Sequence, residues 1–115
     1  MTEERIDAAA FDRVDMRVGV IREVLEFPEA RRPSYRIRVH FGAELGDRWS
    51  VAQAPVAYPD RAALVGRQVI GVVNLEPMRI ARFKSEVLLL GVHGEDGELS
   101  LLRPDRDARV GDRVY

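Results

Sequence analysis

The sequence predicts a small all-β barrel, and three observations lead to this fold class. The apolar residues occur largely in short runs rich in β-branched side chains, with turn-forming glycines and prolines between them. One of these runs, residues 35–41, alternates between apolar and basic residues. Glycines stand inside two other runs, at Gly19 and Gly71, where the coiled strands of a barrel commonly bend. With 115 residues, the chain is long enough for one such domain, residues 1–115.

One short helix is predicted near the N-terminus, over residues 7–14. Asp7 can cap its first turn, and the three alanines that follow favour a helix. The apolar residues of this segment share one side of the helix: Ile6, Ala10, Phe11 and Val14. We expect that side to pack on the domain core or on another chain.

Two strands and a loop follow the helix. The first strand covers residues 16–27, and Gly19 interrupts its alternation, which predicts a bulge or a sharp bend. Residues 27–34 contain two prolines and predict a loop. The second strand has the clearest alternation of the chain. Its apolar residues should point inward (Tyr35, Ile37, Val39 and Phe41) and its basic residues outward (Arg36, Arg38 and His40).

The remaining elements complete a barrel. A turn over 41–47 leads to a third strand over 48–53, and a helical turn within 58–66 ends at Gly66. Buried strands are predicted over 68–75 and 86–92, followed by a turn over 93–98 and short closing strands over 99–104 and 112–115. A five-stranded Greek-key barrel with a helical turn between strands three and four is the OB-fold arrangement, here with extra short C-terminal strands. Such barrels bind oligonucleotides or peptides on their middle strands and adjoining loops.

The composition excludes several function classes. The formal net charge of −1 excludes a polycation that attracts nucleic acid by its bulk charge. The absence of cysteine excludes disulfides, thiolate zinc sites and cysteine nucleophiles. His40 and His93 have no partner at metal-ligand spacing, and no glycine-rich phosphate loop occurs. We therefore expect a binding protein rather than an enzyme, with no metal and no cofactor. No apolar run approaches the ~20 residues that span a bilayer, so we expect a cytoplasmic protein without membrane insertion.

Positive charge is nevertheless concentrated in two stretches of the chain. One stretch lies in and after the first loop, and the other is a predicted loop that leads into the apolar residues 87–90. Their cations suit contacts with a phosphate backbone, and the candidates are Arg32, Arg36, Arg38, Arg79, Arg82 and Lys84. The alternative is that these side chains pair with neighbouring carboxylates in water. Trp49, the only tryptophan, is expected to pack rather than to stack on a base.

Three segments resemble the tRNA-binding OB-fold family: "DMRVGVIREVLEFPEARRPSY", "LVGRQVIGVVNLEPMRIARFKSEVLLLG" and "LLRPD". That family includes domains appended to methionyl- and phenylalanyl-tRNA synthetases and free-standing dimeric proteins. The resemblance covers nearly the whole chain, from about Phe11 to Tyr115, and implies a homodimer that binds tRNA by shape and charge. "FPEAR", "FKSEVL" and "LLRPD" are similar to an export-related chaperone branch, which implies a role in handling preproteins.

The resemblance also implies roles for particular residues. Asn74, Ser85 and Leu88 fall on the nucleic-acid-facing motif of the family, although many members carry methionine in place of Leu88. The tRNA-binding members typically have Ser-Gly where this chain has Ala52 and Gln53. Gln53 is also a candidate nucleic-acid contact, but it fills space that a glycine leaves open, which opposes the close approach of an RNA backbone there and agrees with the chaperone branch.

Two other functions compete with tRNA binding. The protein could bind peptides or unfolded proteins through apolar residues near the rim, which are Phe27, Pro28, Met78, Ile80 and Phe83. Ile80 and Phe83 could equally be buried anchors of their loop. The chain could also act as an accessory tRNA-binding subunit supplied in trans to an aminoacyl-tRNA synthetase.

The two ends of the sequence predict a dimer contact. The helix over 7–14 and the C-terminal extension over 103–115 carry apolar residues that a small barrel does not fully cover. We expect these segments to form an isologous contact between two copies, and its candidate residues are Phe11, Val14, Val110, Val114 and Tyr115.

Overall fold

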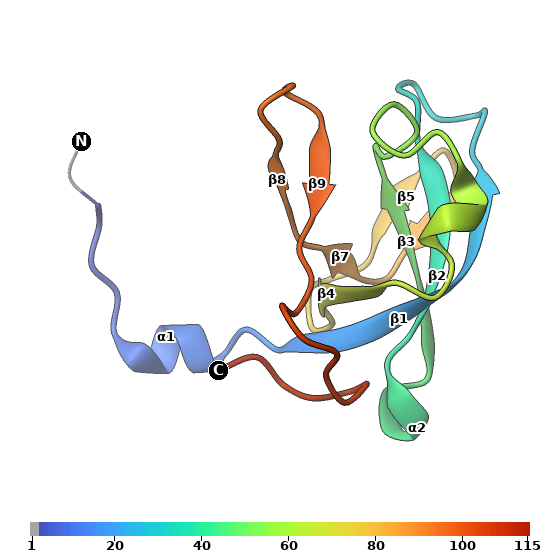
Figure 1. The fold of residues 1–115 in the computed structure, drawn as a ribbon. Coiled ribbons are helices and arrows are strands. Elements are labelled where there is room, and N and C mark those ends of the chain that lie inside the picture. Colours follow the sequence, from blue (N-terminus) through green and yellow to red (C-terminus); the bar gives the residue numbers. More distant parts are fainter. Residues whose placement is uncertain (1–2) are drawn as a thin grey trace.

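A nearly closed antiparallel barrel of five strands forms the body of the molecule in the computed structural model, which describes residues 3–115 (Figure 1). In order around the sheet, the strands are β3 (Asp47–Ala52), β2 (Tyr35–His40), β1 (Met16–Glu26), β4 (Gln68–Val72) and β7 (Leu88–Leu89). The Glu86 amide donates to the Trp49 carbonyl over 2.7 Å, and this bond links the segment before β7 to β3. The predicted all-β OB-fold is therefore confirmed.

Three short helical segments and two hairpins accompany the five strands of the barrel. The helices are α1 (Ala8–Asp12), α2 (Gly42–Leu45) and the 3-10 turn η1 (Arg61–Leu64), and η1 is the helical turn predicted between the third and fourth strands. One hairpin pairs β5 (Met78–Ile80) with β6 (Phe83–Ser85), and the other pairs β8 (Gly91–His93) with β9 (Leu99–Leu101). No helix within residues 3–115 is long and apolar enough to cross a membrane.

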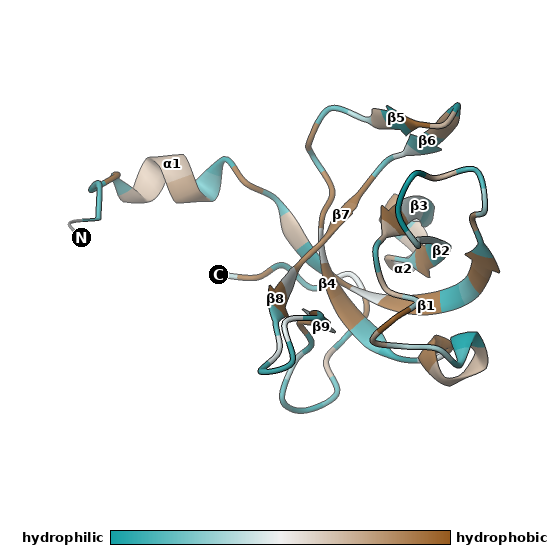
Figure 2. Ribbon diagram, turned by 90° about the horizontal axis from the view of Figure 1, so that it is seen from above, coloured by the Kyte–Doolittle hydropathy of each residue, from teal (hydrophilic) through white to brown (hydrophobic). Residues whose placement is uncertain are grey.

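Strand β2 supplies the centre of the core because its alternation places every second side chain inside the barrel. Tyr35, Ile37 and Val39 are buried, as predicted, and Leu64 from η1 is also buried in the core cluster. In Figure 2, β4 and parts of β1 have the colour of hydrophobic residues, whereas the loop between β8 and β9 is largely hydrophilic.

The ring of Phe41 lies against two glycines on neighbouring strands. A Cβ atom on Gly19 in β1 would lie 2.7 Å from Phe41 Cε1, and one on Gly71 in β4 would lie 2.8 Å from Phe41 Cζ. The prediction of a bulge at Gly19 is wrong, because Gly19 pairs in regular register with Val69 and the register shift occurs between Ile21 and Glu23. The glycine leaves room for the close approach of the Val39 and Phe41 side chains.

Four other predicted elements differ from the structure. The turn predicted over 41–47 contains the short helix α2, and the predicted basic loop is the β5–β6 hairpin. The strand predicted over 86–92 is divided, because β7 pairs with β4 whereas β8 pairs with β9. The strand predicted over 112–115 is reduced to a single bridge between Arg17 and Arg113.

The N-terminal helix forms at the predicted place and extends away from the barrel (Figure 1). Its capping bond runs from the Ala10 amide to Asp7 Oδ1 over 3.2 Å. Its apolar side is not covered by the core, since Ile6 is 71% exposed and Phe11 is 41% exposed. The expectation that this side packs on the domain core is therefore wrong, and packing on another chain stays a prediction.

Candidate nucleic-acid interface

A hollow of about 590 Å³ lies between the loop over 27–34 and the β5–β6 hairpin. Its lining comes from the loop, from the end of β3 and from the hairpin, and combines polar or charged residues with apolar ones: Glu29, Arg31, Arg32, Ser34, Gln53 and Arg79 with Ala30, Val51, Ile80 and Ala81. We call this hollow the basic groove. A second hollow of about 520 Å³ continues it toward the β8–β9 hairpin, and the two share Arg32, Val51 and Gln53. The combined surface crosses the end of the middle strands, where OB-folds bind their ligands.

The cations at the basic groove are not neutralised by salt bridges. Within residues 3–115, the basic partners in ion pairs are Arg17, Arg38, His40, Arg61 and Arg113. The arginines of the groove are absent from these pairs, although Glu29 contributes one carboxylate to the lining. Three guanidinium groups face one carboxylate, so the groove has an excess of positive charge that suits phosphate oxygens.

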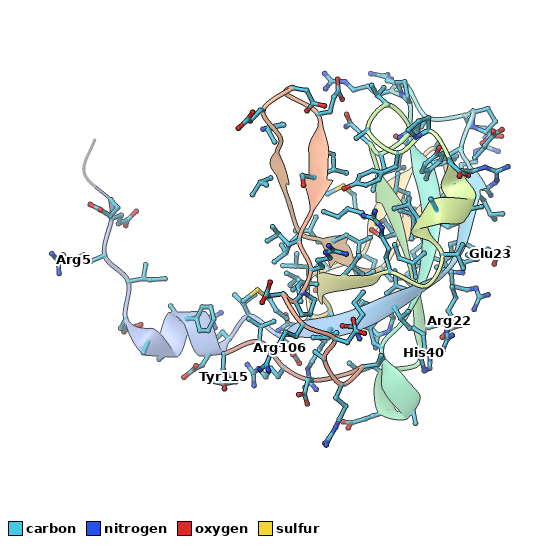
Figure 3. All side chains as sticks on the ribbon, viewed as in Figure 1. Arg5, Arg22, Glu23, His40, Arg106 and Tyr115 are labelled. Atoms are coloured by element: carbon cyan, nitrogen blue, oxygen red, sulfur yellow. The ribbon has the colours of Figure 1, made fainter. Side chains whose placement is uncertain are left out.

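The outer face of β2 is, in contrast, neutralised. Arg38 Nε lies 3.1 Å from Glu23 Oε1, and its Nη1 donates to Asp47. His40 Nδ1 lies 2.7 Å from Asp47 Oδ1, and the hydrogen bonds from His40 and Arg38 lower the pKa of Asp47 below its usual value. Figure 3 shows Glu23 and His40 on this outer part of the barrel. Arg38 is therefore not brought into the basic groove with the other candidate arginines.

Arg36 has a packing role that joins the first loop to the hairpin. Its Nε and Nη2 atoms donate to the Glu26 carbonyl, and its guanidinium carbon lies 5.5 Å from the Phe27 ring centre and 5.7 Å from that of Phe83. Phe83 also meets the Trp49 ring edge-on at 5.6 Å. These contacts hold the hairpin on the barrel. The rings of Phe27, Trp49 and Phe83 are therefore used in packing and are not available to stack on a base or a peptide.

The β5–β6 hairpin carries three of the predicted cations and is locally strained. Ala81 and Arg82 form its two-residue turn with φ values of 46° and 70°. Such turns normally use Asn-Gly, because each non-glycine residue in the left-handed region costs about 1–2 kcal/mol. Arg79 also pairs directly with Lys84 across the hairpin, which opposes like charges. The hairpin thus holds its cations together at a cost in stability, and bound anions would offset that cost.

The strain at the hairpin tip gives a stability prediction. Replacing Arg82→Gly should raise the free energy of unfolding by about 0.5–1 kcal/mol relative to Arg82→Ala, because only glycine relieves the positive φ. Both variants lose the same charge, so the difference between them isolates the backbone term. Urea unfolding curves measure it, and equal midpoints for the two variants would contradict the strain.

An apolar groove lies beside the same hairpin. It has a volume of about 190 Å³, and its lining includes Val51, Leu75, Met78, Ile80, Ser85, Val87 and Leu88. Leu75 is 49% exposed, Met78 64% and Leu88 51%. Leu88 was predicted within a continuous buried run, but strand alternation turns it outward while Val87 and Leu89 are buried. Ser85 Oγ accepts from the Val51 amide over 3.3 Å and helps to hold β6 on β3.

The structure therefore separates the predicted site residues into groups. Arg32, Gln53 and Arg79 meet in the basic groove, and Met78, Ile80, Ser85 and Leu88 meet in the apolar groove. Arg82 and Lys84 are on the hairpin, while Pro28 belongs to the first loop without lining either groove. Arg31 and Leu75 were not among the predicted contacts. Arg31 could have been found from its place beside Arg32 in a proline-bounded loop, whereas no sequence signal distinguishes Leu75.

Asn74 lies outside both grooves, beside the segment that joins α1 to β1. Its Nδ2 atom donates to the Arg13 carbonyl over 2.8 Å, and its Oδ1 atom accepts from the Asp15 amide over 2.9 Å. Both polar atoms of this side chain already have backbone partners.

The predicted dimer residues are distributed over the two ends of the chain. Phe11 and Tyr115 are exposed, Val14 is at the margin of exposure, and Val110 and Val114 are half-buried. Near the C-terminus, Arg113 Nη2 donates to the Asp12 carbonyl, at the last residue of α1, over 2.6 Å. In the part of the chain that the structure describes, no cluster of three or more histidine or acidic side chains could hold a metal ion.

Comparison with known proteins finds similar sequences and similar structures. The family model described as "Putative tRNA binding domain" matches residues 16–113. Among curated proteins, a methionine–tRNA ligase of Methanococcus maripaludis is 38% identical over 112 residues, which cover 96% of this chain. The chain spans only 16% of the length of that relative.

Solved structures of similar length also match. The CsaA chaperone protein from Picrophilus torridus is 39% identical with a TM-score of 0.88, over 96% of this chain and 100% of that one. The chaperone CsaA from Bacillus anthracis is 38% identical with a TM-score of 0.89, over 97% and 100%. A methionyl-tRNA-synthetase-related protein from Pyrococcus horikoshii is 26% identical with a TM-score of 0.83, over 98% and 100%.

Proposed function

Because the chain belongs to the tRNA-binding domain family, we propose that it is a non-catalytic, homodimeric protein that binds tRNA by shape and charge. The observation that carries this proposal is the basic groove, which Arg31, Arg32 and Arg79 line together without a salt bridge to any residue of 3–115. By its similarity to the two CsaA structures, we further propose that it acts in the cytoplasm as a chaperone for preproteins.

The groove suits recognition of an RNA backbone more than recognition of a base sequence. Arginine donors bind phosphate oxygens in pairs, and the Gln53 amide adds one neutral donor and acceptor on the floor. Arg82 and Lys84 extend the positive surface along the hairpin. Phosphate contacts of this kind set position and affinity without reading a sequence, and folded RNA is recognised largely through its shape.

A titration of the wild-type protein with folded tRNA at several salt concentrations tests this function. We expect log affinity to fall linearly with log salt, with a slope of about 0.7–0.9 for each phosphate contact. A double-stranded DNA of similar length is the control polyanion, and it should bind more weakly because its helix has a different shape. An affinity for tRNA that does not change with salt would exclude the proposed mode.

Peptide binding is a second candidate, and the apolar groove is the observation that favours it. Leu75, Met78 and Leu88 form an exposed apolar surface next to the basic hairpin, and methionine adapts to varied apolar partners. Suppression of the aggregation of an unfolded client that persists at high salt would support this function. A role in trans for a synthetase is the remaining alternative, since the matched ligase contains this domain as part of a longer chain.

The proposed homodimer is supported by the apolar side of α1 and of the residues that precede it, which together we call the N-terminal arm. Ile6, Phe11 and Val14 are exposed on a segment that extends from the barrel, and Tyr115 is fully exposed at the other end. A second copy can cover these side chains by a two-fold contact, in which each arm lies on its partner. Two basic grooves in one particle would also increase the avidity for a large RNA.

Replacing Phe11→Asp should convert the dimer to a monomer, because it places a carboxylate where the contact would remove water. We expect the dissociation constant of the dimer to rise by at least about 100-fold, as measured by sedimentation equilibrium. Ala9→Asp is the matched control, since it adds the same charge to another side of α1. An equal loss of dimer in both variants would argue against the apolar side as the contact.

A further inference from the structure

The segment that joins α1 to the barrel is held by the end of β4. Asn74 Nδ2 donates to the Arg13 carbonyl over 2.8 Å, and Asn74 Oδ1 accepts from the Asp15 amide over 2.9 Å. The neighbouring Val73 amide donates to the Asp15 carbonyl over 2.9 Å. Three hydrogen bonds from two adjacent residues thus fix the three residues that follow the helix.

The C-terminal segment fixes the same region from another direction. Arg113 Nη2 donates to the Asp12 carbonyl over 2.6 Å, at the last residue of α1. Arg17 binds Asp15 Oδ1 through Nε over 2.6 Å and the Gly111 carbonyl through Nη1 over 3.0 Å. The hydrogen bond from Arg17 also lowers the pKa of Asp15, so this carboxylate stays charged at more acidic pH than an ordinary aspartate. The direction in which α1 leaves the barrel is therefore set by a small number of named contacts.

The Asn74 side chain is suited to this anchoring task. Asparagine offers a donor and an acceptor on one planar group, and both are used here on backbone groups two residues apart. A carboxylate could not donate to the Arg13 carbonyl, and alanine could not bind either group. The side chain lines neither the basic groove nor the apolar groove, which places it apart from the candidate ligand contacts.

We infer that Asn74 is a positioning residue for the N-terminal arm, and that by fixing the arm it presents Phe11 and Val14 to a second copy of the chain. The inference rests on the proposed homodimer for its second part only. It assigns Asn74 to assembly of the particle instead of the nucleic-acid contact that the family resemblance implies.

Limited trypsin digestion measures the anchoring directly, because trypsin cleaves after Arg13, whose carbonyl is the Asn74 partner. In Asn74→Ala we expect the bond between residues 13 and 14 to be cleaved about tenfold faster than in the wild type. Mass spectrometry of samples taken over time measures the rate. Asn74→Asp keeps the acceptor for the Asp15 amide and loses the donor, so an intermediate rate is expected. Asp96→Ala is the control, since it removes a side-chain bond to the backbone, from the Glu98 amide to Asp96 Oδ1, in the turn between β8 and β9. That control should leave cleavage after Arg13 unchanged.

Two further measurements separate assembly from ligand binding. The dissociation constant of the Asn74→Ala dimer should rise about tenfold, whereas its affinity for tRNA, measured at protein concentrations where it is dimeric, should stay within twofold of the wild type. Unchanged cleavage together with a large loss of tRNA affinity would overturn the inference and make Asn74 an RNA contact. If the wild-type protein is monomeric, the dimer proposal fails, and the cleavage rate still decides whether Asn74 anchors the arm.

Discussion

Replacing Arg32 and Arg79 together with alanine should weaken the binding of folded tRNA by about 10- to 100-fold at low salt. Both side chains line the basic groove from opposite sides, one from the first loop and one from β5. Each lost phosphate contact should also reduce the slope of log affinity against log salt by about 0.7–0.9. Filter binding or fluorescence anisotropy across a salt series measures both quantities.

The control for this variant must remove the same charge elsewhere. Arg22 and Arg106 are exposed, lie outside both grooves and form no salt bridge within residues 3–115. A double variant of these two arginines should keep most of the tRNA affinity. If both double variants bind equally weakly, net charge rather than the groove determines binding, and the proposed interface is wrong.

Replacing Gly19→Ala should lower the free energy of unfolding by about 1–3 kcal/mol. The added Cβ would lie 2.5 Å from Val39 Cγ1 and 2.7 Å from Phe41 Cε1, and both neighbours are fully enclosed core residues. Neither can move without displacing the rest of the core. Urea unfolding at constant pH measures the loss.

A matched alanine substitution separates overpacking from the general effect of losing a glycine. At Gly91 in β8 the closest atom to a new Cβ is Leu99 Cδ1 at 2.5 Å, the methyl end of a half-buried side chain that can rotate away. Gly91→Ala should therefore cost less than Gly19→Ala. Combining Gly19→Ala with Phe41→Leu should recover part of the loss, since the two changes share one space. Full additivity in that double variant would show that Phe41 is not the obstacle.

The strands that the sequence predicts well are those with one buried face. The alternation from Tyr35 to Phe41 specifies both the strand and its inward side, because a strand places successive side chains on opposite faces. The β5–β6 hairpin was missed since its turn, Ala81 and Arg82, lacks the Asn-Gly signal that normally marks such hairpins. The continuous apolar run over 87–90 contains no alternation that shows which side chains face outward, so the exposure of Leu88 agrees only with the position that the family resemblance implies.

Residues of the candidate site could be predicted only where neighbouring residues in the sequence indicate their role. Arg79 and Arg32 could be found because cations cluster around them. The neutralisation of Arg38 could not, since its carboxylate partners, Glu23 and Asp47, come from two neighbouring strands. The position of Asn74 beside Asp15 depends on a contact across 59 residues of chain, which no local pattern records.

The ribbon formed by β5 and β6 has two chemically opposed surfaces, and each strand is only three residues long. Met78 lines the apolar groove, and the next residue, Arg79, lines the basic groove. Inserting or deleting a single residue just before this ribbon would exchange the two surfaces, since side chains reverse with every step along a strand. The number of residues over 73–77 therefore determines which surface of the ribbon borders each groove, and a change in that number is a short mutational route by which the protein would exchange the ligands of the two surfaces.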